Sequence, residues 1–368
     1  MVDDNGTAAL VIDIGTGLIK AGWAGEDTPR TIQPTVVARV KKFRGEVTGP
    51  SGQGYDDQEF LTGTHAIRAV AEHPDDLELA FPVEHQEIVD WSAVTQTLEY
   101  LYAHEFQVDS DKHPVVIVDS PFSTPKYREK LADLFFRHFR VPSLLIYNSA
   151  VLSLFSTGTT RGIVLQSGES SSYVVPIFEG YALRHGIEKM DIGGDSLTRA
   201  MMASLDRTGM RLDVARDIKE KLGLVKNAND AVPEPSMQYE LPDGQVVEVG
   251  KECRYAVGEM LFSPPSGVGL PRLLLNGIGK CDANLQTDLL GNIVIDGGNS
   301  LMKGFHERMN AEINALIGPG KPFHVTGKRK HASWVGGSMM GSLSTFDDIH
   351  ITRQEFEDAD DIVHKKYL

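Results

Sequence analysis

The sequence is poor in cysteine and in positive charge. Only two of its 368 residues are cysteines, Cys253 and Cys281, which excludes a disulfide framework or a zinc knuckle and favours a reducing compartment. Lys and Arg number 36 against 51 Asp and Glu, for a formal net charge of −15. Such an acidic surface disfavours direct nucleic-acid binding and binding to anionic membranes. The short basic runs at 41–44 and 328–330 are more typical of solvated loops.

Long apolar runs, short-period repeats and low-complexity tracts are also missing. No apolar segment reaches the roughly 20 residues that a membrane-spanning helix needs, so we expect no membrane insertion. The acidic start, Met-Val-Asp-Asp, is unlike a signal peptide. The hydrophobic share of 41% and the charged share of 24% fit a globular chain long enough for two or three domains. We therefore expect a cytoplasmic protein, with the nucleus as the alternative.

The most informative segment is a glycine-containing turn between two apolar stretches, A-A-L-V-I-D-I-G-T-G-L-I-K at 8–20. Strands at 8–14 and 17–24 would form a hairpin whose backbone N–H groups can converge on an anion. Glycine lets a phosphate approach the backbone closely, and the carboxylate of Asp13 can face a magnesium ion. Taken alone, the motif is also compatible with an ordinary hairpin.

Two later segments carry similar glycine turns. The stretch at 161–181 is again strand, Gly/Ser turn and strand, which suggests two related lobes with phosphate loops facing each other across a cleft. Coincidence is the alternative, because strand–turn–strand units are common. At 292–302 a strand is followed by a glycine pair and then by a helix to about residue 316, a suitable place for a phosphate near a helix N-terminus.

The remaining pattern alternates helices and strands. Hydrophobic periodicity predicts helices at 92–106, 125–139, 149–156 and 211–225. A buried strand is predicted at 114–121, and a hairpin at 239–249 is expected to turn at Asp243-Gly244. The segment 40–60 is rich in glycine and charge and is predicted to be a loop.

Three glycine turns in this order resemble the ATPase superfamily of actins, sugar kinases and heat-shock chaperones. Longer stretches narrow the resemblance to the actin family and extend over nearly the whole chain. They include K-A-G-W-A-G-E-D-T-P-R at 20–30, N-S-A-V-L-S-L-F-S-T-G at 148–158, V-P-I-F-E-G-Y-A-L-R-H at 175–185, R-D-I-K-E-K-L at 216–222 and W-V-G-G-S at 334–338. The chain therefore resembles a divergent actin or an actin-related protein.

The resemblance implies an α/β fold of two lobes and four subdomains, with ATP (or ADP) and Mg²⁺ in the central cleft. A small lobe would comprise residues 1–156 and 332–368, with a tip subdomain at 35–81. A large lobe would comprise residues 157–331, with an outer subdomain at 193–265.

The resemblance also implies which residues contact the nucleotide. The β- and γ-phosphates would be held by Gly15, Thr16, Gly17, Leu18 and Lys20. The facing loop would be Gly168, Glu169 and Ser170, and the sugar and phosphate side would be lined by Gly297, Gly298 and Asn299. The adenosine would contact Lys219, Glu220 and Lys330, with Glu220 accepting hydrogen bonds from the ribose. Asp13 would face the metal, and His85 matches the sensor-loop histidine of the family.

Three positions at the implied reaction centre depart from the family. Ser149 stands where actins carry the glutamine that orients the attacking water, and it is too short to do so. Gln166 replaces an aspartate that helps hold the hydrated magnesium, so the charge that a hard cation prefers is lost. Tyr173 replaces a histidine of the water network. Because hydrolysis depends on positioning water and stabilising charge, we expect nucleotide binding with weak or absent hydrolysis. Relay through Asn148 or Glu169 is the alternative.

The implied assembly surfaces differ as well. The loop at 40–60 is longer than usual and lacks an apolar tip, the opposing plug loop at 263–276 is compressed, and the tail K-K-Y-L lacks the usual cysteine. These differences favour dedicated protein partners in a cytoskeletal or multi-subunit assembly. The alternatives are self-assembly into filaments by a divergent actin with active ATPase, and a kinase or chaperone relative, for which the sequence offers no support.

Overall fold

A computed structural model describes residues 8–41, 61–205, 210–227, 235–241, 244–265, 267–318, 320–326, 330–359 and 361–367. The chain divides into two compact units. Unit 1 comprises the residues up to Leu152 together with those from Trp334 onward, and unit 2 comprises Ser153–Ser333. Both units mix helices and strands, and each is described by itself. None of the described helices is long and apolar enough to cross a membrane.

Unit 1 is organised around a six-stranded sheet with the order β17-β9-β8-β1-β2-β3. Its strands are β1 (Leu10–Ile14), β2 (Leu18–Trp23), β3 (Thr31–Pro34), β8 (Val115–Asp119), β9 (Ser143–Asn148) and β17 (Ile351–Thr352). β1 pairs antiparallel with β2 and parallel with β8, which pairs parallel with β9. All five residues of β8 are buried, as expected for a parallel strand with both faces covered.

The helices of unit 1 follow the predicted apolar spacing. α2 (Trp91–Tyr100) continues as a π-helical turn at Leu101–Phe106, and α3 (Pro125–Asp133) continues as another at Leu134–His138. Thr124 caps α3, whose first position is proline, the residue best tolerated there. The other helices are α12 (Phe346–Ile349), α13 (Arg353–Asp358) and α14 (Ile362–Lys366), while α4 (Ser149–Phe155) and α11 (Ala332–Gly341) each span a boundary between the units.

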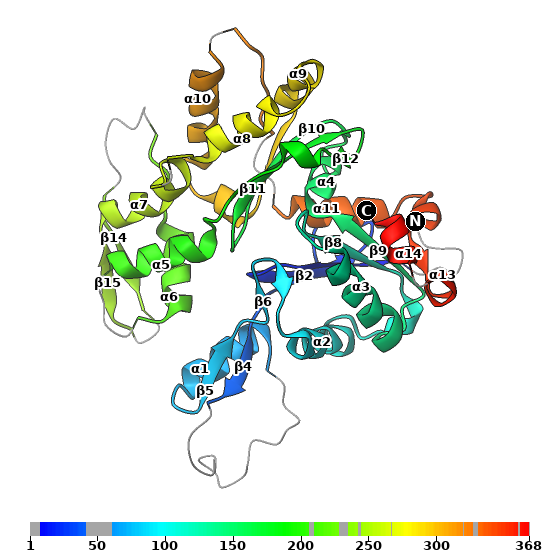
Figure 1. Ribbon diagram of the computed structural model, residues 1–368. Coiled ribbons are helices and arrows are strands. Elements are labelled where there is room, and N and C mark those ends of the chain that lie inside the picture. The colour runs from blue at the N-terminus through cyan, green and yellow to red at the C-terminus, as the bar shows by residue number, and fades with distance from the viewer. Residues whose placement is uncertain are drawn as a thin grey trace. The chain divides into compact units, whose positions relative to one another are not determined.

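Two smaller pieces of unit 1 lie outside the main sheet. α1 (Gly63–Glu72) packs on the antiparallel pair β4 (Val37–Val40) and β5 (Leu77–Ala80), as Figure 1 shows. A short hairpin follows, made of β6 (Val83–Glu84) and β7 (Glu87–Ile88).

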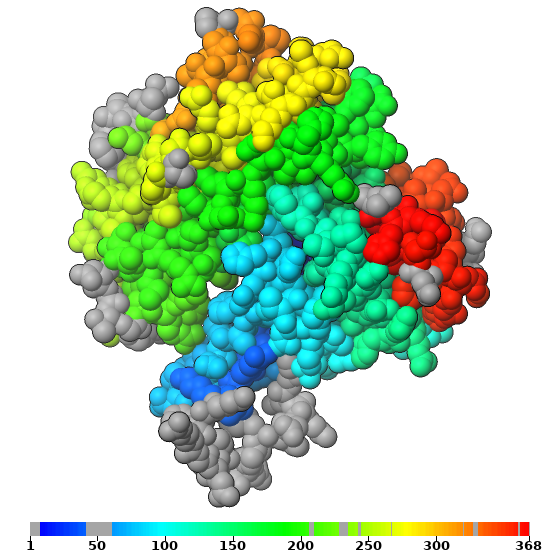
Figure 2. Space-filling model, in the orientation of Figure 1, coloured from blue at the N-terminus to red at the C-terminus, as the bar shows by residue number. Residues whose placement is uncertain are grey.

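Unit 2 contains a sheet with the order β12-β11-β10-β16, to which β13 adds by pairing with β11. Its strands are β10 (Gly162–Ser167), β11 (Ser172–Phe178), β12 (Tyr181–Ala182), β13 (Glu188–Met190) and β16 (Ile293–Asp296), and a separate hairpin comprises β14 (Met237–Glu240) and β15 (Val246–Val249). The helices are α5 (Gly194–Ser204), α6 (Leu212–Leu222), α7 (Lys251–Phe262), α8 (Leu270–Gly279), α9 (Ala283–Gly291) and α10 (Phe305–Ile317). Figure 2 shows α8 and α9, in yellow, side by side on the surface of this unit.

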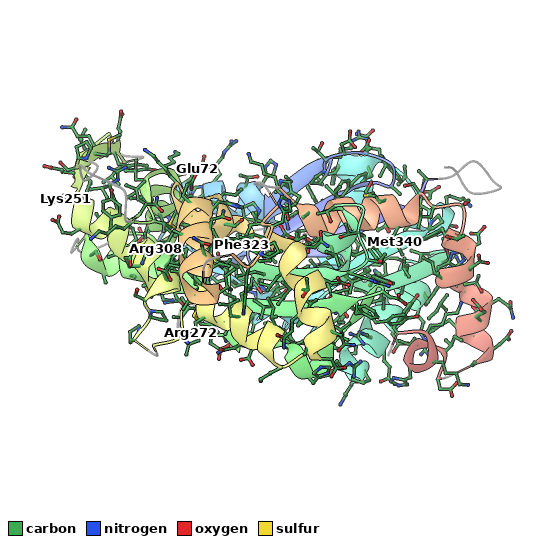
Figure 3. The ribbon with its side chains drawn as sticks, turned by 90° about the horizontal axis from the view of Figure 1, so that it is seen from above. Glu72, Lys251, Arg272, Arg308, Phe323 and Met340 are labelled. Carbon is green, nitrogen blue, oxygen red and sulfur yellow. The ribbon has the colours of Figure 1, made fainter. Side chains whose placement is uncertain are left out.

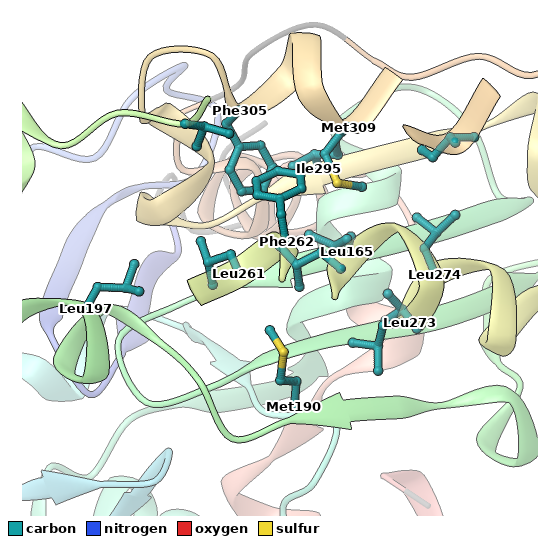
Figure 4. Packing of buried hydrophobic residues seen from close by; sticks show 14 of the residues in the cluster. Leu165, Met190, Leu197, Leu261, Phe262, Leu273, Leu274, Ile295, Phe305 and Met309 are labelled. Atoms are coloured by element: carbon teal, nitrogen blue, oxygen red, sulfur yellow. The ribbon is translucent and has the colours of Figure 1, made fainter. Parts of the chain in front are cut away.

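The core of unit 2 joins its helices to the central strands. Phe305 of α10 meets Phe262 of α7 edge to face, with ring centroids 5.3 Å apart, and both lie near Leu165 of β10 and Ile295 of β16 (Figure 4). At the rim of this core the guanidinium of Arg308 lies over the Phe262 ring. Figure 3 labels Arg308 on the orange helix α10. Burial of these large apolar side chains fixes α7 and α10 against the sheet.

Most of the predicted elements are confirmed, including both glycine-turn hairpins and the helices at 92–106, 125–139, 149–156 and 211–225. The helix after the glycine pair starts later than predicted. A short 3₁₀ turn at Gly298–Leu301 comes first, and α10 begins only after Gly304, whose φ of +89° lies in the left-handed region that favours glycine.

One loop prediction was wrong in part. The segment 263–276 was interpreted as a compressed loop, but α8 begins at Leu270. Leu270, Leu273, Leu274 and Ile278 repeat with helical spacing and are buried, so hydrophobic periodicity overrides the glycines and prolines that precede them. Residues 42–60, which make up most of the predicted loop at 40–60, and Asp243 of the predicted hairpin turn lie outside the described residues.

The close approach of α7 to the chain after α6 predicts the effect of one substitution. A Cβ atom added at Gly258 would lie 2.2 Å from the carbonyl oxygen of Leu224. The backbone would have to shift to make room for it. We expect Gly258→Ala to lower the free energy of unfolding by about 1–3 kcal/mol. Gly279→Ala is the matched control, because nothing lies within 4 Å of the added atom. Urea titration followed by circular dichroism measures both, and equal midpoints would contradict the expectation.

Candidate functional site

In unit 1 the first glycine turn joins β1 and β2. Asp13 and Lys20 are directly opposite in the hairpin register, and the Lys20 ammonium lies 2.6 Å from the Asp13 carboxylate. Thr35 forms two hydrogen bonds with the turn. Its hydroxyl donates to the carbonyl of Gly15 (2.7 Å), and its N–H donates to the carbonyl of Gly17 (3.1 Å). The structure therefore places a carboxylate and an ammonium beside the turn that was expected to hold phosphate.

The β6–β7 hairpin contacts the same turn. His85 and Gln86 form its two-residue loop, with φ values of +48° and +68°, as a twisted hairpin turn requires. The N–H of Gln86 donates to the Thr16 hydroxyl (3.0 Å), and the Gln86 side-chain oxygen accepts from the Ser120 hydroxyl (2.8 Å). Sequence reasoning singled out His85 but missed Gln86, because only the folded hairpin brings it to Thr16.

In unit 2 the second glycine turn is braced by the start of α5. Gly194 and Asp195 donate their N–H groups to the carbonyls of Gly168 and Glu169, both at 2.8 Å. The side-chain amide of Asn299 donates to the carbonyl of Gly168 (2.8 Å). The second and third glycine turns, which are about 130 residues apart in the sequence, are thus hydrogen-bonded to each other.

The backbone of the third turn packs directly against the backbone of the second. Gly297 has a φ of +98°, and an added Cβ atom would lie 2.2 Å from the carbonyl oxygen of Ser167, so only glycine fits. The next residue, Gly298, opens the 3₁₀ turn. Lys330 is exposed and follows residues that are not described, while Ser170 lies half-buried in the second turn.

A mixed cluster of charges lies between the second turn and α6. The carboxylate of Glu169 pairs with the guanidinium of Arg216 at 2.5 Å, and only 15% and 22% of the two side chains are exposed. Lys219 is buried, and its ammonium donates to the carbonyl of Gly194 (3.2 Å). Burial lowers the pKa of Lys219, although the Glu169 carboxylate favours its charged form. Glu220, the next residue, lies at the exposed edge of this cluster, and its charge also favours the charged form of Lys219 and so raises its pKa.

Two of the three substituted positions contact each other directly. Gln166 and Tyr173 are opposite in the β10–β11 register, and the Tyr173 hydroxyl donates to the Gln166 side-chain oxygen (2.6 Å). The Gln166 amide nitrogen donates to Asp296 and to the Ser153 hydroxyl, both at 3.2 Å. The third position, Ser149, is buried at the first turn of α4. Sequence reasoning missed Asp296, whose place opposite Gln166 depends on strand register.

The chain matches the family model described as Actin over residues 4–221 and 207–368. The protein belongs to the actin family. This match confirms the family resemblance and the expected fold class, and actin-family proteins generally bind a nucleotide with Mg²⁺. The glycine turns lack Cβ atoms and carry backbone N–H groups, which suits the phosphates of such a ligand, and the Asp13 carboxylate supplies an oxygen of the kind that Mg²⁺ prefers.

The Glu169–Arg216 pair predicts a site-specific loss of stability. Glu169→Gln removes the charge but keeps the shape, leaving the mostly buried guanidinium of Arg216 without its counter-ion. We expect the free energy of unfolding to fall by about 2 kcal/mol. Glu179→Gln is the control, because Glu179 and its partner Arg161 are about half exposed and such pairs contribute under about 1 kcal/mol. Chemical denaturation of the ligand-free proteins measures both, and a larger loss in the control would contradict the expectation.

Lys219 predicts a pH dependence of stability. Its pKa is lowered in the folded chain and takes its ordinary value of 10.5 in the unfolded chain. Between these two values the unfolded state binds more protons, so stability rises with pH. We expect Lys219→Met to be more stable than the wild type at neutral pH, with an advantage that shrinks as pH rises. Denaturation of both ligand-free proteins over a pH series that runs up to 10.5 measures this difference, and the ionisation of other groups in the unfolded chain is common to the two proteins; a constant difference would contradict the expectation.

Proposed function

We propose that the protein is an actin-related, ATP-binding protein of the cytoskeleton or of a multi-subunit assembly, in which the nucleotide is mainly structural and hydrolysis is weak or absent. The observation that carries this proposal is the hydrogen bonding of Gln166. Its amide takes the position of a family carboxylate and is engaged on both sides by buried partners.

Nucleotide binding is supported by the glycine turns. The family resemblance assigns the β- and γ-phosphates to Gly15, Thr16, Gly17, Leu18 and Lys20. It assigns the second turn, Gly168, Glu169 and Ser170, to the same ligand, with Gly297, Gly298 and Asn299 on the sugar and phosphate side. Within unit 2 the hydrogen bond from Asn299 to Gly168 orders two of these turns before any ligand arrives, which lowers the entropic cost of binding.

The adenosine contacts are proposed for Lys219, Glu220 and Lys330. Lys219 lies beside Glu169 and Gly194. Glu220 and Lys330 are exposed, so their side chains are accessible to a ligand, and the contacts that they form have to offset the hydration that they lose on binding. Asp13 is proposed for the metal, in exchange for its contact with Lys20. When bound, the metal would neutralise phosphate charge, and the chain's own residues would supply orientation.

Weak hydrolysis is supported by the chemistry of the substituted positions. Gln166 is neutral, and its oxygen is already an acceptor for Tyr173. Tyr173 is buried and directed at Gln166, so it is not positioned as a free base. A serine at 149 lacks the length to orient water at a distant phosphate. Positioning and charge stabilisation provide most of the barrier reduction in phosphoryl transfer, so losing both leaves binding without fast turnover.

A tightly held nucleotide then acts as a folding element. A ligand that binds only the folded chain adds about 2.7 kcal/mol of stability when its concentration is a hundred times its dissociation constant. The membership of the actin family also suggests protein–protein assembly, and we propose dedicated protein partners. A filament-forming actin with active ATPase remains the second candidate, supported by the family match alone.

Nucleotide analysis and phosphate release test the proposal. Purified protein is expected to carry ATP or ADP and to release phosphate slowly, with or without pelletable assemblies. Brisk phosphate release accompanied by filaments would overturn it in favour of the second candidate, and a chain free of nucleotide after gentle isolation would overturn both.

Ser149→Gln provides a gain-of-function test of the same proposal. An amide on the first turn of α4 restores a group long enough to orient water, and we expect phosphate release to rise about tenfold, equivalent to about 1.4 kcal/mol of barrier. Ser149→Ala is the matched control, because it alters the hydroxyl without adding reach, and its rate should equal that of the wild type. Equal rates in all three proteins would contradict the assignment of Ser149.

A further inference from the structure

Asp296 is a buried carboxylate that the preceding mechanism does not use. It ends β16, is only 4% exposed, and accepts four hydrogen bonds. One oxygen accepts from the N–H of Gly297 (2.7 Å). The other accepts from the Ser153 hydroxyl (2.8 Å), the Gln166 amide (3.2 Å) and the N–H of Ser333 (3.2 Å). All of these donors are neutral.

This lack of a cation distinguishes Asp296 from the other buried aspartates in the described ranges. Asp13 pairs with Lys20, and Asp119 pairs with Arg128 at 2.7 Å. No Lys, Arg or His nitrogen of the described residues forms such a pair with Asp296. A buried charge without a counter-ion is costly, and a cation supplied by a ligand would offset that cost.

The position of Asp296 indicates which cation. Asp296 and Gln166 are partners in the parallel register of β16 and β10, so the carboxylate lies one strand away from the site where the family holds a metal-facing aspartate. Asp296 also directly precedes the Gly297-Gly298 turn assigned to the nucleotide. A negative charge therefore lies next to Gln166, the position that the family resemblance assigns to the neighbourhood of the hydrated divalent cation.

We propose that Asp296 is a positioning residue for the magnesium ion of the bound nucleotide, supplying from β16 the negative charge that Gln166 lacks on β10. This inference rests on the proposed function. Asp296 acts in two ways: its charge attracts the cation through poorly solvated protein, where charges interact strongly, and its hydrogen bond fixes the Gln166 amide with the oxygen toward Tyr173. Because both Asp296 oxygens accept from protein donors, it acts through its charge and not as a direct ligand.

Moving the negative charge from position 166 to Asp296 explains how the chain can bind nucleotide and yet hydrolyse it slowly. The carboxylate keeps the electrostatic attraction for the cation, so nucleotide retention survives. The carboxylate is buried and both of its oxygens already accept from protein donors, so it is not placed to orient an attacking water. A chain that has lost Asp at 166 therefore keeps the metal-dependent part of its affinity.

Three variants test the proposal through the Mg²⁺ dependence of nucleotide retention. Asp296→Asn removes the charge and keeps the shape, and the Mg²⁺ concentration at half-maximal retention of a fluorescent ATP analogue should rise about tenfold. The exchange variant Gln166→Asp/Asp296→Asn returns the charge to β10 and should recover wild-type Mg²⁺ dependence within about threefold. Ser153→Ala is the control, because it removes a neutral donor and should leave the Mg²⁺ dependence unchanged while lowering stability slightly.

A purely structural role for Asp296 predicts a different pattern. The Asp296→Asn protein would then lose melting temperature equally with and without Mg²⁺, its half-maximal concentration would match the wild type, and the exchange variant would show no recovery; that result would overturn the proposal. If Asp296→Asn does not fold, the exchange variant decides alone: a wild-type Mg²⁺ response supports the proposal and a weakened one overturns it. A wild type that retains no nucleotide at any Mg²⁺ concentration would overturn the proposed function as well, which keeps the two failures distinguishable.

Discussion

The structure of unit 2 depends on the contact between its two glycine turns. Gly297 lies against the backbone of Ser167 so closely that no side chain fits between them. The side-chain amide of Asn299 also donates a hydrogen bond to the carbonyl of Gly168. This contact fixes the ends of β10 and β16 relative to each other. The side chains at those ends, Gln166 and Asp296, are neighbours because the strands end together.

The buried carboxylates of the described residues have cationic partners, with one exception. The buried or half-buried carboxylates of Asp13, Asp119 and Glu169 each have a cation within hydrogen-bonding distance. Desolvation makes such pairing nearly obligatory, since an isolated buried ion loses far more hydration energy than neutral hydrogen bonds return. Asp296 has four neutral donors and no cation among the described residues, and this difference is the basis of the proposal made for it above.

Much of the fold was predictable from the sequence because its signals are local. Strand–turn–strand patterns and helical periodicity identified both glycine-turn hairpins and the helices at 92–106, 125–139, 149–156 and 211–225 within a few residues at each end. They did not identify α1, α5, α7 or α9. The error at α8 also comes from reading local signals. The residues before Leu270 are rich in glycine and proline, which favoured a loop, although an amphipathic helix begins at Leu270. The family resemblance supplied the glycine turns of the candidate site, and the identity of the substituted residues was readable directly.

The partners of those residues were not predictable, because they depend on register and on contacts between distant segments. Gln166 and Tyr173 are seven residues apart, and only the antiparallel pairing of β10 and β11 shows that they face each other. Asp296 lies 130 residues from Gln166 and carries no motif of its own. Gln86 similarly reaches Thr16 only through the left-handed turn of the β6–β7 hairpin.

The hydrogen bond between Tyr173 and Gln166 also changes how the two substitutions are understood. Under the proposed function, each substitution taken separately removes one group: a charge near the metal, and a histidine of the water network. Taken together they form a satisfied buried pair, since the phenol donates and the amide oxygen accepts. A residue at 173 that cannot donate would leave the buried Gln166 oxygen without this hydrogen bond, which costs about 1–3 kcal/mol. The same contact that stabilises the pairing of β10 with β11 therefore underlies the weak hydrolysis that we propose.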